Sequence, residues 1–173
     1  MPLGTHTTSK GRTTQKSRGK AQKQLDAIKL LMKDHDDVGA MFKQFMKMKK
    51  DGAQKGELLE QICTALTIHA KIEEEIFYPA CRDALAEGGE MMLDEAEIEH
   101  ASIKSLVQEL EDADADDAMT AAKVKVLCEY VTHHVKEEEK TIFPKVKKSD
   151  LDLDELGAEL MERKQQLMGE EEE

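Results

Sequence analysis

The chain has 173 residues, of which 39% are hydrophobic, 36% are charged and only 3% are aromatic, with no tryptophan. This length is enough for one domain with a hydrophobic core and tails, and a composition rich in Ala, Glu, Lys, Leu and Met favours helices over strands. No apolar run approaches the ~18 residues of a membrane-spanning helix and no signal-peptide pattern is present, which predicts a cytoplasmic protein without a membrane partner.

The two ends of the chain differ in charge. Residues 1–23 hold six of the 25 basic side chains and no acidic one, so the other 150 residues carry 19 basic against 37 acidic side chains, a net charge of −18. Residues 1–20 are polar and lack an apolar face, which predicts a disordered basic tail. The acidic body argues against nucleic acid as a partner, apart from a weak contact through this tail. The sequence gives no indication of the oligomeric state.

Residues 21–148 are predicted to form four long helices. Apolar side chains recur there at spacings of three, four and seven residues, which is the period of an amphipathic α-helix. The predicted helices cover about residues 21–49, 57–85, 90–110 and 118–143. Short connections between long helices make neighbours antiparallel, which predicts an all-α fold, an up-down-up-down four-helix bundle.

Glycines and prolines set the predicted boundaries of these helices. Gly52 and Gly56 are expected in the first loop, Pro79 is expected to bend or begin to end the second helix, and Pro144 is expected to end the fourth. Residues 149–173 are predicted to be a C-terminal extension with a short fifth helix and an acidic tail.

A pattern of histidine and glutamate occurs twice, displaced by 65 residues. The unit His-x34-His-x3-Glu comprises first His35, His69 and Glu73, and then His100, His134 and Glu138. An imidazole and a carboxylate four residues apart lie on one face of a helix. Apolar positions around both units match at the same offset, so these six side chains lie on core-facing stripes. Six buried polar groups would have few partners there, and a pair of transition metals would satisfy all of them. A merely structural cluster is the alternative.

A second His-x3-Glu pair overlaps the fourth helix at His133 and Glu137. His134 and Glu138 are preferred because they complete the 65-residue repeat and continue the apolar stripe that includes Val131. His133 is expected at the boundary of the site.

Four segments resemble the hemerythrin-like, or HHE cation-binding, domain family. They are DHDDV at 34–38, HAKIEEEIFYP at 69–79, EIEH at 97–100 and HVKEEEKTIFP at 134–144. The resemblance covers about residues 22–148 and all four predicted helices. It implies two non-heme iron ions, oxo- or hydroxo-bridged, with the two glutamates as bridging carboxylates. The ligands that it implies are His35, His69, Glu73, His100, His134 and Glu138.

The chain departs from the oxygen-carrying members of this family at two positions. Those members have a His-x3-His pair on the third helix, whereas the residue four before His100 is Ala96. Their last carboxylate lies five residues after the final histidine, where this chain has Glu139 next to the better-aligned Glu138. Glu97 is a candidate additional ligand, and solvent is the alternative. An exchangeable position predicts reaction with oxygen, peroxide or nitric oxide rather than reversible oxygen carriage.

Three function classes remain open at this point. The first is a redox-active di-iron protein that binds or reacts with O2, H2O2 or NO. The second is a non-enzymatic iron or oxygen sensor or storage module, and the third is a metal-free interaction bundle. No residue stands out as a dedicated acid or base, so the sequence does not decide whether the protein is an enzyme.

Overall fold

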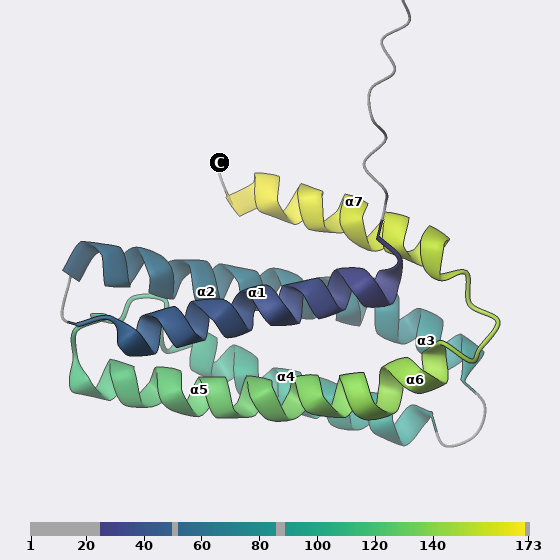
Figure 1. The fold of residues 1–173 in the computed structure, drawn as a ribbon, viewed down its shortest axis with the longest axis horizontal. Coiled ribbons are helices and arrows are strands. Elements are labelled where there is room, and N and C mark those ends of the chain that lie inside the picture. Colours follow the sequence, from purple (N-terminus) through teal and green to yellow (C-terminus); the bar gives the residue numbers. More distant parts are fainter. Residues whose placement is uncertain (1–24, 50–51, 86–88, 172–173) are drawn as a thin grey trace, which may run out of the picture.

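The computed structural model describes residues 25–49, 52–85 and 89–171, and every regular element within these ranges is a helix (Figure 1). The elements are, in chain order, α1 (Ala27–Lys47), α2 (Gly52–Ile72), η1 (Glu73–Phe77), α3 (Tyr78–Ala84), α4 (Glu90–Gln108), α5 (Ala118–Glu137), η2 (Glu138–Ile142), α6 (Phe143–Val146) and α7 (Leu153–Glu171). The predicted all-helical class is confirmed for this part of the chain. The predicted tail at residues 1–20 lies outside it. None of the described helices is both long and apolar enough to cross a membrane.

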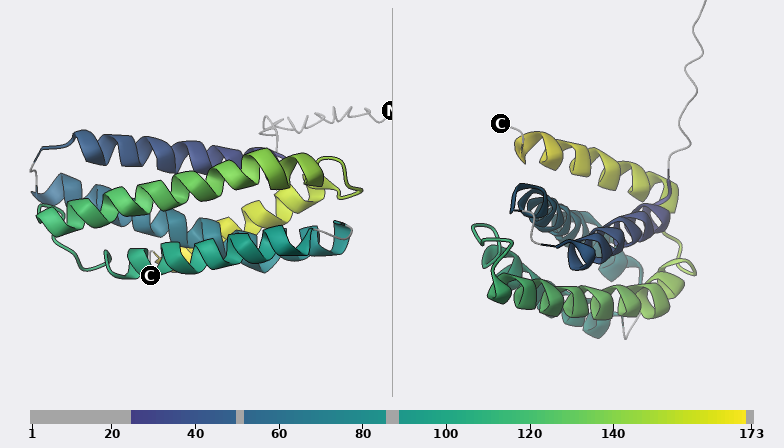
Figure 2. Two further views of the ribbon diagram at one scale, coloured as in Figure 1. Left: turned by 90° about the horizontal axis from the view of Figure 1, so that it is seen from below. Right: turned by 60° about the vertical axis from the view of Figure 1, so that its left-hand side comes forward.

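The helices α1, α2, α4 and α5 lie side by side, and each runs opposite to the one before it (Figures 1 and 2). Contacts join α1 to α2 and α5, and α4 to α2 and α5, so the four helices surround a common interior. The C-terminal helix α7 packs on the outside of α1 and α2.

The core consists of two hydrophobic clusters separated by a polar layer. The first cluster includes Leu31, Ile72, Phe77, Leu93, Phe143 and Leu160. The second cluster includes Val38, Phe42, Leu66, Ile103, Leu127 and Val131. Between them lie the buried polar residues of the repeated units, one helical turn from each cluster along the chain. The hydrophobic layers keep water away from this polar layer on both sides.

The helices pass both prolines by changing their hydrogen-bond pattern. A proline in a regular helix clashes with the carbonyl four residues before it. Pro79 and Pro144 each follow a π-helical segment, η1 or η2, in which the turn is wider. The π-type bonds run from the Tyr78 N–H to the Glu73 carbonyl and from the Phe143 N–H to the Glu138 carbonyl. The helix then continues to Val146, so the prediction that Pro144 ends it is wrong.

The start of α2 also differs from the prediction. Gly52 and Gly56 lie inside the helix rather than in a loop. A helical glycine costs about 1 kcal/mol relative to alanine, and packing of the same helical turn offsets this cost. Lys55 is buried there, with its ammonium 4.9 Å from the centre of the Phe45 ring and 3.8 Å from the Asp116 carboxylate.

The C-terminal helix is longer than the short helix predicted from the sequence. The nineteen residues of α7 bury Leu156, Leu160 and Leu167 against the first hydrophobic cluster. Close approach to the start of α1 depends on Gly157. A Cβ at this position would stand 2.5 Å from the Leu25 carbonyl oxygen.

Replacing Gly157 by Ala is expected to destabilise the protein by about 1–3 kcal/mol, because the added methyl group has no space against the backbone of α1. Gly39→Ala is the matched control, since a Cβ on Gly39 in α1 meets nothing within 4 Å. This control should be neutral or stabilising by about 0.5–1 kcal/mol. Denaturant unfolding of both variants measures the difference. Equal stabilities would show that α7 does not depend on this close approach.

Candidate metal centre

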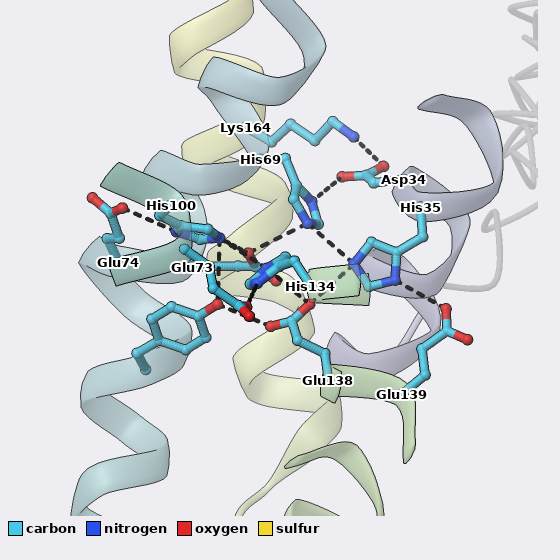
Figure 3. A network of polar contacts seen from close by, with 12 residues as sticks. Asp34, His35, His69, Glu73, Glu74, His100, His134, Glu138, Glu139 and Lys164 are labelled. Carbon is cyan, nitrogen blue, oxygen red and sulfur yellow. Dashed lines mark hydrogen bonds and ion pairs between the residues drawn. The ribbon is translucent and has the colours of Figure 1, made fainter. Parts of the chain in front are cut away.

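Six predicted ligand residues meet in the polar layer between the two hydrophobic clusters (Figure 3). Two groups of residues could each hold a metal ion, because within each group the ligand atoms all lie within 4.8 Å of one another. One group comprises His35, His69, Glu73 and Glu138, and the other comprises Glu73, His100 and His134. The four histidines come from α1, α2, α4 and α5, and the two glutamates are the first residues of η1 and η2. Glu73 belongs to both groups, so the arrangement offers two adjacent metal positions that share a carboxylate.

Each histidine directs one ring nitrogen, Nε2, inward and the other, Nδ1, towards a carboxylate outside the cluster. The Nδ1 atoms of three histidines lie at hydrogen-bond distance from their carboxylates: His35 from Glu139 at 3.0 Å, His100 from Glu74 at 2.9 Å, and His134 from Glu99 at 2.9 Å. The fourth, His69, lies 3.6 Å from Asp34. An ionised carboxylate only accepts hydrogen bonds, so a neutral histidine carries its proton on Nδ1 and presents a free lone pair at Nε2.

These four outer carboxylates follow the 65-residue repeat, although they were not predicted as a set from the sequence. Asp34 and Glu99 each precede an equivalent histidine, and Glu74 and Glu139 each follow an equivalent glutamate. The signal was therefore present as a matching offset, but it was hidden among many other acidic residues. The repeat extends to the residues that orient the histidines.

The inward nitrogens face one another at short range. The two Nε2 atoms of His35 and His69 are 3.2 Å apart, and those of His100 and His134 are 3.0 Å apart. Two free lone pairs repel at this distance unless a proton or a cation lies between them. Two nitrogens bound to one metal at ~2.1 Å and at a right angle would be about 3.0 Å apart. The spacing therefore suits shared coordination of each histidine pair.

The two central carboxylates are fully buried and incompletely bonded. Both oxygens of Glu73 and the Oε2 atom of Glu138 have no hydrogen-bond partner in the described part of the chain. Burial, and then the charge of Glu138, raise the pKa of the Glu73 carboxyl well above its usual range. Buried carboxylates without donors are costly unless a cation accepts them. The donor set therefore fits a pair of cations.

Tyr78 makes the two metal positions unequal. Its hydroxyl donates to Glu138 Oε1 at 2.9 Å and lies 3.4 Å from Nε2 of His100. Burial raises the pKa of this phenol well above its usual value, so it remains a neutral donor. The equivalent residue in the repeat, 65 positions later, is Phe143, which stacks on His35 with ring centres 5.8 Å apart. Tyr78 thus places a hydroxyl beside His100, whereas Phe143 places an apolar ring beside His35.

Two other candidate residues lie outside the centre. Glu97 was a candidate additional ligand, but its carboxylate accepts a hydrogen bond from Arg82 at 3.0 Å and its side chain is 46% exposed. From the position three residues before His100 it faces solvent, so this ligand assignment is corrected. His133 is 60% exposed and contacts Glu99 at 3.0 Å, beside the buried His134.

Small cavities lie on both sides of the centre. One of about 20 Å³ is lined by the four histidines and by apolar side chains that include Val38, Leu66 and Ile103. Another of about 30 Å³ is lined by Ala96, Glu99, His134 and Glu138. A cavity of ~10–15 Å³ is enough for one water molecule. The two cavities therefore have room for a molecule of only a few atoms, and one of them lies beside Ala96.

Known proteins resemble this chain in sequence and in fold. A model of the hemerythrin HHE cation-binding domain matches residues 26–146. A solved structure of a hemerythrin HHE cation-binding domain-containing protein from Mycobacterium kansasii has a TM-score of 0.72 and 21% identity, over 84% of this chain and 89% of that chain. A DNA nickase from Nostoc sp. (strain PCC 7120) is 26% identical over 131 residues, which make up 76% of this chain and 36% of that protein. The chain thus spans about a third of that relative.

The neighbouring histidines of α5 provide a test of the centre. His134→Ala should lower the bound metal and the stability of the metal-loaded protein together, because metal bound to the native state adds to its stability. His133→Ala is the control, since this side chain is exposed and contributes no atom to either donor group. Elemental analysis and thermal unfolding measure both effects. Equal metal loss in the two variants would contradict the assignment.

Metal binding should release protons at neutral pH. Burial opposes the charged form of His35, but the contact with the Glu138 carboxylate outweighs the effect of burial and raises the pKa of His35 from 6.5 to about 9. The charged imidazole therefore stabilises the metal-free protein fully below pH 6.5, and this contribution is lost as the pH rises through about 9. A metal ligand must be deprotonated, so apparent metal affinity should rise with pH up to about 9. Calorimetry in buffers of different ionisation enthalpy would count the protons. No proton release at pH 7 would refute this.

Proposed function

Since the chain belongs to the hemerythrin HHE cation-binding domain family, we propose that its buried histidine and glutamate cluster is a non-heme di-iron centre that binds or reacts with oxygen, peroxide or nitric oxide. The observation that carries the proposal is the pairing of inward histidine nitrogens, 3.2 Å and 3.0 Å apart, around buried carboxylate oxygens without hydrogen-bond partners among the described residues. A pair of cations would replace the protons that otherwise have to separate the inward nitrogens and would supply the missing bonds.

Iron suits this donor set better than zinc. The two groups combine imidazole with carboxylate and contain no cysteine. Structural zinc prefers a closed tetrahedral site and is commonly bound by thiolates, whereas histidine with carboxylate and open positions is typical of non-heme iron. His35, His69, His100 and His134 would hold two ions, and Glu73 and Glu138 would bridge them. When bound, the irons would supply electron transfer to a small molecule.

The surrounding residues would control what reaches the irons. Val38, Leu66 and Ile103 line the cavity beside the histidines and exclude bulk water. Tyr78 donates a hydrogen bond to Glu138 and orients this carboxylate. A cavity of about 30 Å³ lies beside Ala96, His134 and Glu138. These features favour a substrate of two to four atoms, and the space beside Ala96 favours reaction over reversible carriage.

A binder without turnover is the alternative, as a sensor of oxygen or iron or as a store. It would use the same centre, and the small size of the cavities fits it equally well. The activity named for the Nostoc relative is not proposed for this chain. The matched region is 36% of that protein, and the net charge of −18 beyond residue 23 would repel a DNA backbone.

The proposal predicts two irons per chain in protein produced with sufficient iron and purified in air. Elemental analysis and the absorption spectrum should give this stoichiometry and the charge-transfer bands of bridged ferric ions. A double variant, His100→Ala with His134→Ala, should lose most of the iron and the bands. One zinc and no iron, or a folded, colourless protein without metal, would reject the proposal. Consumption of added hydrogen peroxide by the wild type, but not by the double variant, would favour the reactive protein over the binder.

A further inference from the structure

The C-terminal helix contacts one outer carboxylate of the candidate centre, Asp34, through the side chain of Lys164. Lys164 of α7 forms an ion pair and hydrogen bond with Asp34, next to His35 on α1 (Figure 3). Its neighbour Arg163 points to Glu75 on η1, at 2.7 Å. Both residues fasten α7 to the helices below, but only Lys164 contacts a carboxylate that faces a histidine of the centre.

Asp34 is the outer carboxylate that lies farthest from the Nδ1 atom of its histidine. It lies 3.6 Å from Nδ1 of His69, and neither this nitrogen nor the Oδ2 atom of Asp34 has a hydrogen-bond partner among the described residues. The equivalent carboxylate in the second half, Glu99, lies 2.9 Å from Nδ1 of His134. An aspartate has one methylene fewer than a glutamate, so it needs help to keep its carboxylate at the histidine.

A lysine supports another outer carboxylate too, but from within the four central helices. The Glu74 carboxylate lies 2.8 Å from the ammonium of Lys104 on α4. Asp34 instead receives its lysine from α7, which lies outside the four central helices and outside the 65-residue repeat.

A large cavity beside this ion pair gives the Asp34 carboxylate room to turn away from His69. A cavity of about 430 Å³ between α1, α2 and α7 is lined by Lys164, Asp34, Val38 and Met168. Asp34 and Val38 also line the small cavity that the four histidines line. Without Lys164, the Asp34 carboxylate would be free to turn into the larger cavity, where water would solvate it. The ion pair holds the carboxylate on the side of His69.

We propose that Lys164 is a positioning residue of the metal centre: by holding Asp34 against His69, it fixes the proton of His69 on Nδ1 and keeps Nε2 available to a metal. The proposal rests on the proposed metal-binding function. It assigns α7, which lies outside the four central helices, a direct part in preparing one of the two histidine pairs.

The test compares Lys164→Met with Arg163→Met in the full-length protein. Each variant removes one ion pair that anchors α7, but only the first releases Asp34. In the iron-loaded protein, Lys164→Met should speed iron transfer to a chelator by up to about 10–100-fold, the loss of metal affinity that follows when the partner of a ligand is itself removed. Arg163→Met should release iron at the wild-type rate, and Lys164→Arg should restore most of the retention. Thermal unfolding of all variants records any common loss from weaker docking of α7.

A second measurement does not need iron. In the metal-free protein at neutral pH, the ring nitrogens of His69 should have the nitrogen-15 shifts of a single tautomer with the proton on Nδ1. Lys164→Met should shift them towards a mixture of the two tautomers, while Arg163→Met should not. Equal iron release from both methionine variants, or an unchanged His69 spectrum in Lys164→Met, would overturn the inference. Absence of iron from the wild type would reject the proposed function, and the His69 spectrum would still decide the role of Lys164.

Discussion

Burial of ionisable groups midway along the helices is the constraint on which the rest of the structure depends. Four imidazoles and two carboxylates occupy a layer in which each residue is at most 8% exposed, between two hydrophobic clusters. Such groups are tolerated only when each has a partner. The outer carboxylates face the Nδ1 atoms and are hydrogen-bonded to three of them, while the Nε2 atoms and the central carboxylates offer ligand atoms to cations. The wider turns of η1 and η2 start at Glu73 and Glu138, so the departure from regular helix begins at the two central carboxylates.

The outer and the inner carboxylates of the polar layer differ in their ion-pair partners. Two of the four outer carboxylates contact a lysine of the protein: Glu74 contacts Lys104, and Asp34 contacts Lys164. The inner carboxylates, Glu73 and Glu138, are fully buried, and among the described residues their ion-pair partners are histidines of the cluster rather than lysine or arginine. Bound cations are often the largest charges in a site of this kind. A cation would therefore find the inner carboxylates free of competing lysine or arginine side chains in the described part of the chain.

Much of the helical architecture could be predicted because it depends on local periodicity. The apolar spacing identified the long helices, and the repeat brought together six residues that the structure places within one layer. What failed depended on tertiary packing or on local geometry. Gly52 and Gly56 are helical because the turn that contains them is packed, and the proline at 144 is accommodated by η2. Glu97 lies one residue away from the inward stripe, beside Arg82. The extent of α7 depends on contacts with α1 and α2, which no local pattern encodes.

The crossed pairing of the two halves has a consequence for symmetry. Glu139 of the second half orients His35 of the first, and Glu74 of the first orients His100 of the second. Neither half contains a complete set by itself, whereas two copies of one half, related by a twofold axis, would contain every inner and outer group twice. Such a homodimer would be obliged to place the same side chain at both equivalent positions. A single covalent chain is free of that obligation, and it places Tyr78 at one position and Phe143 at the other. Joining the halves in one chain therefore allows the two sides of the cluster to differ chemically although both halves follow the same repeat.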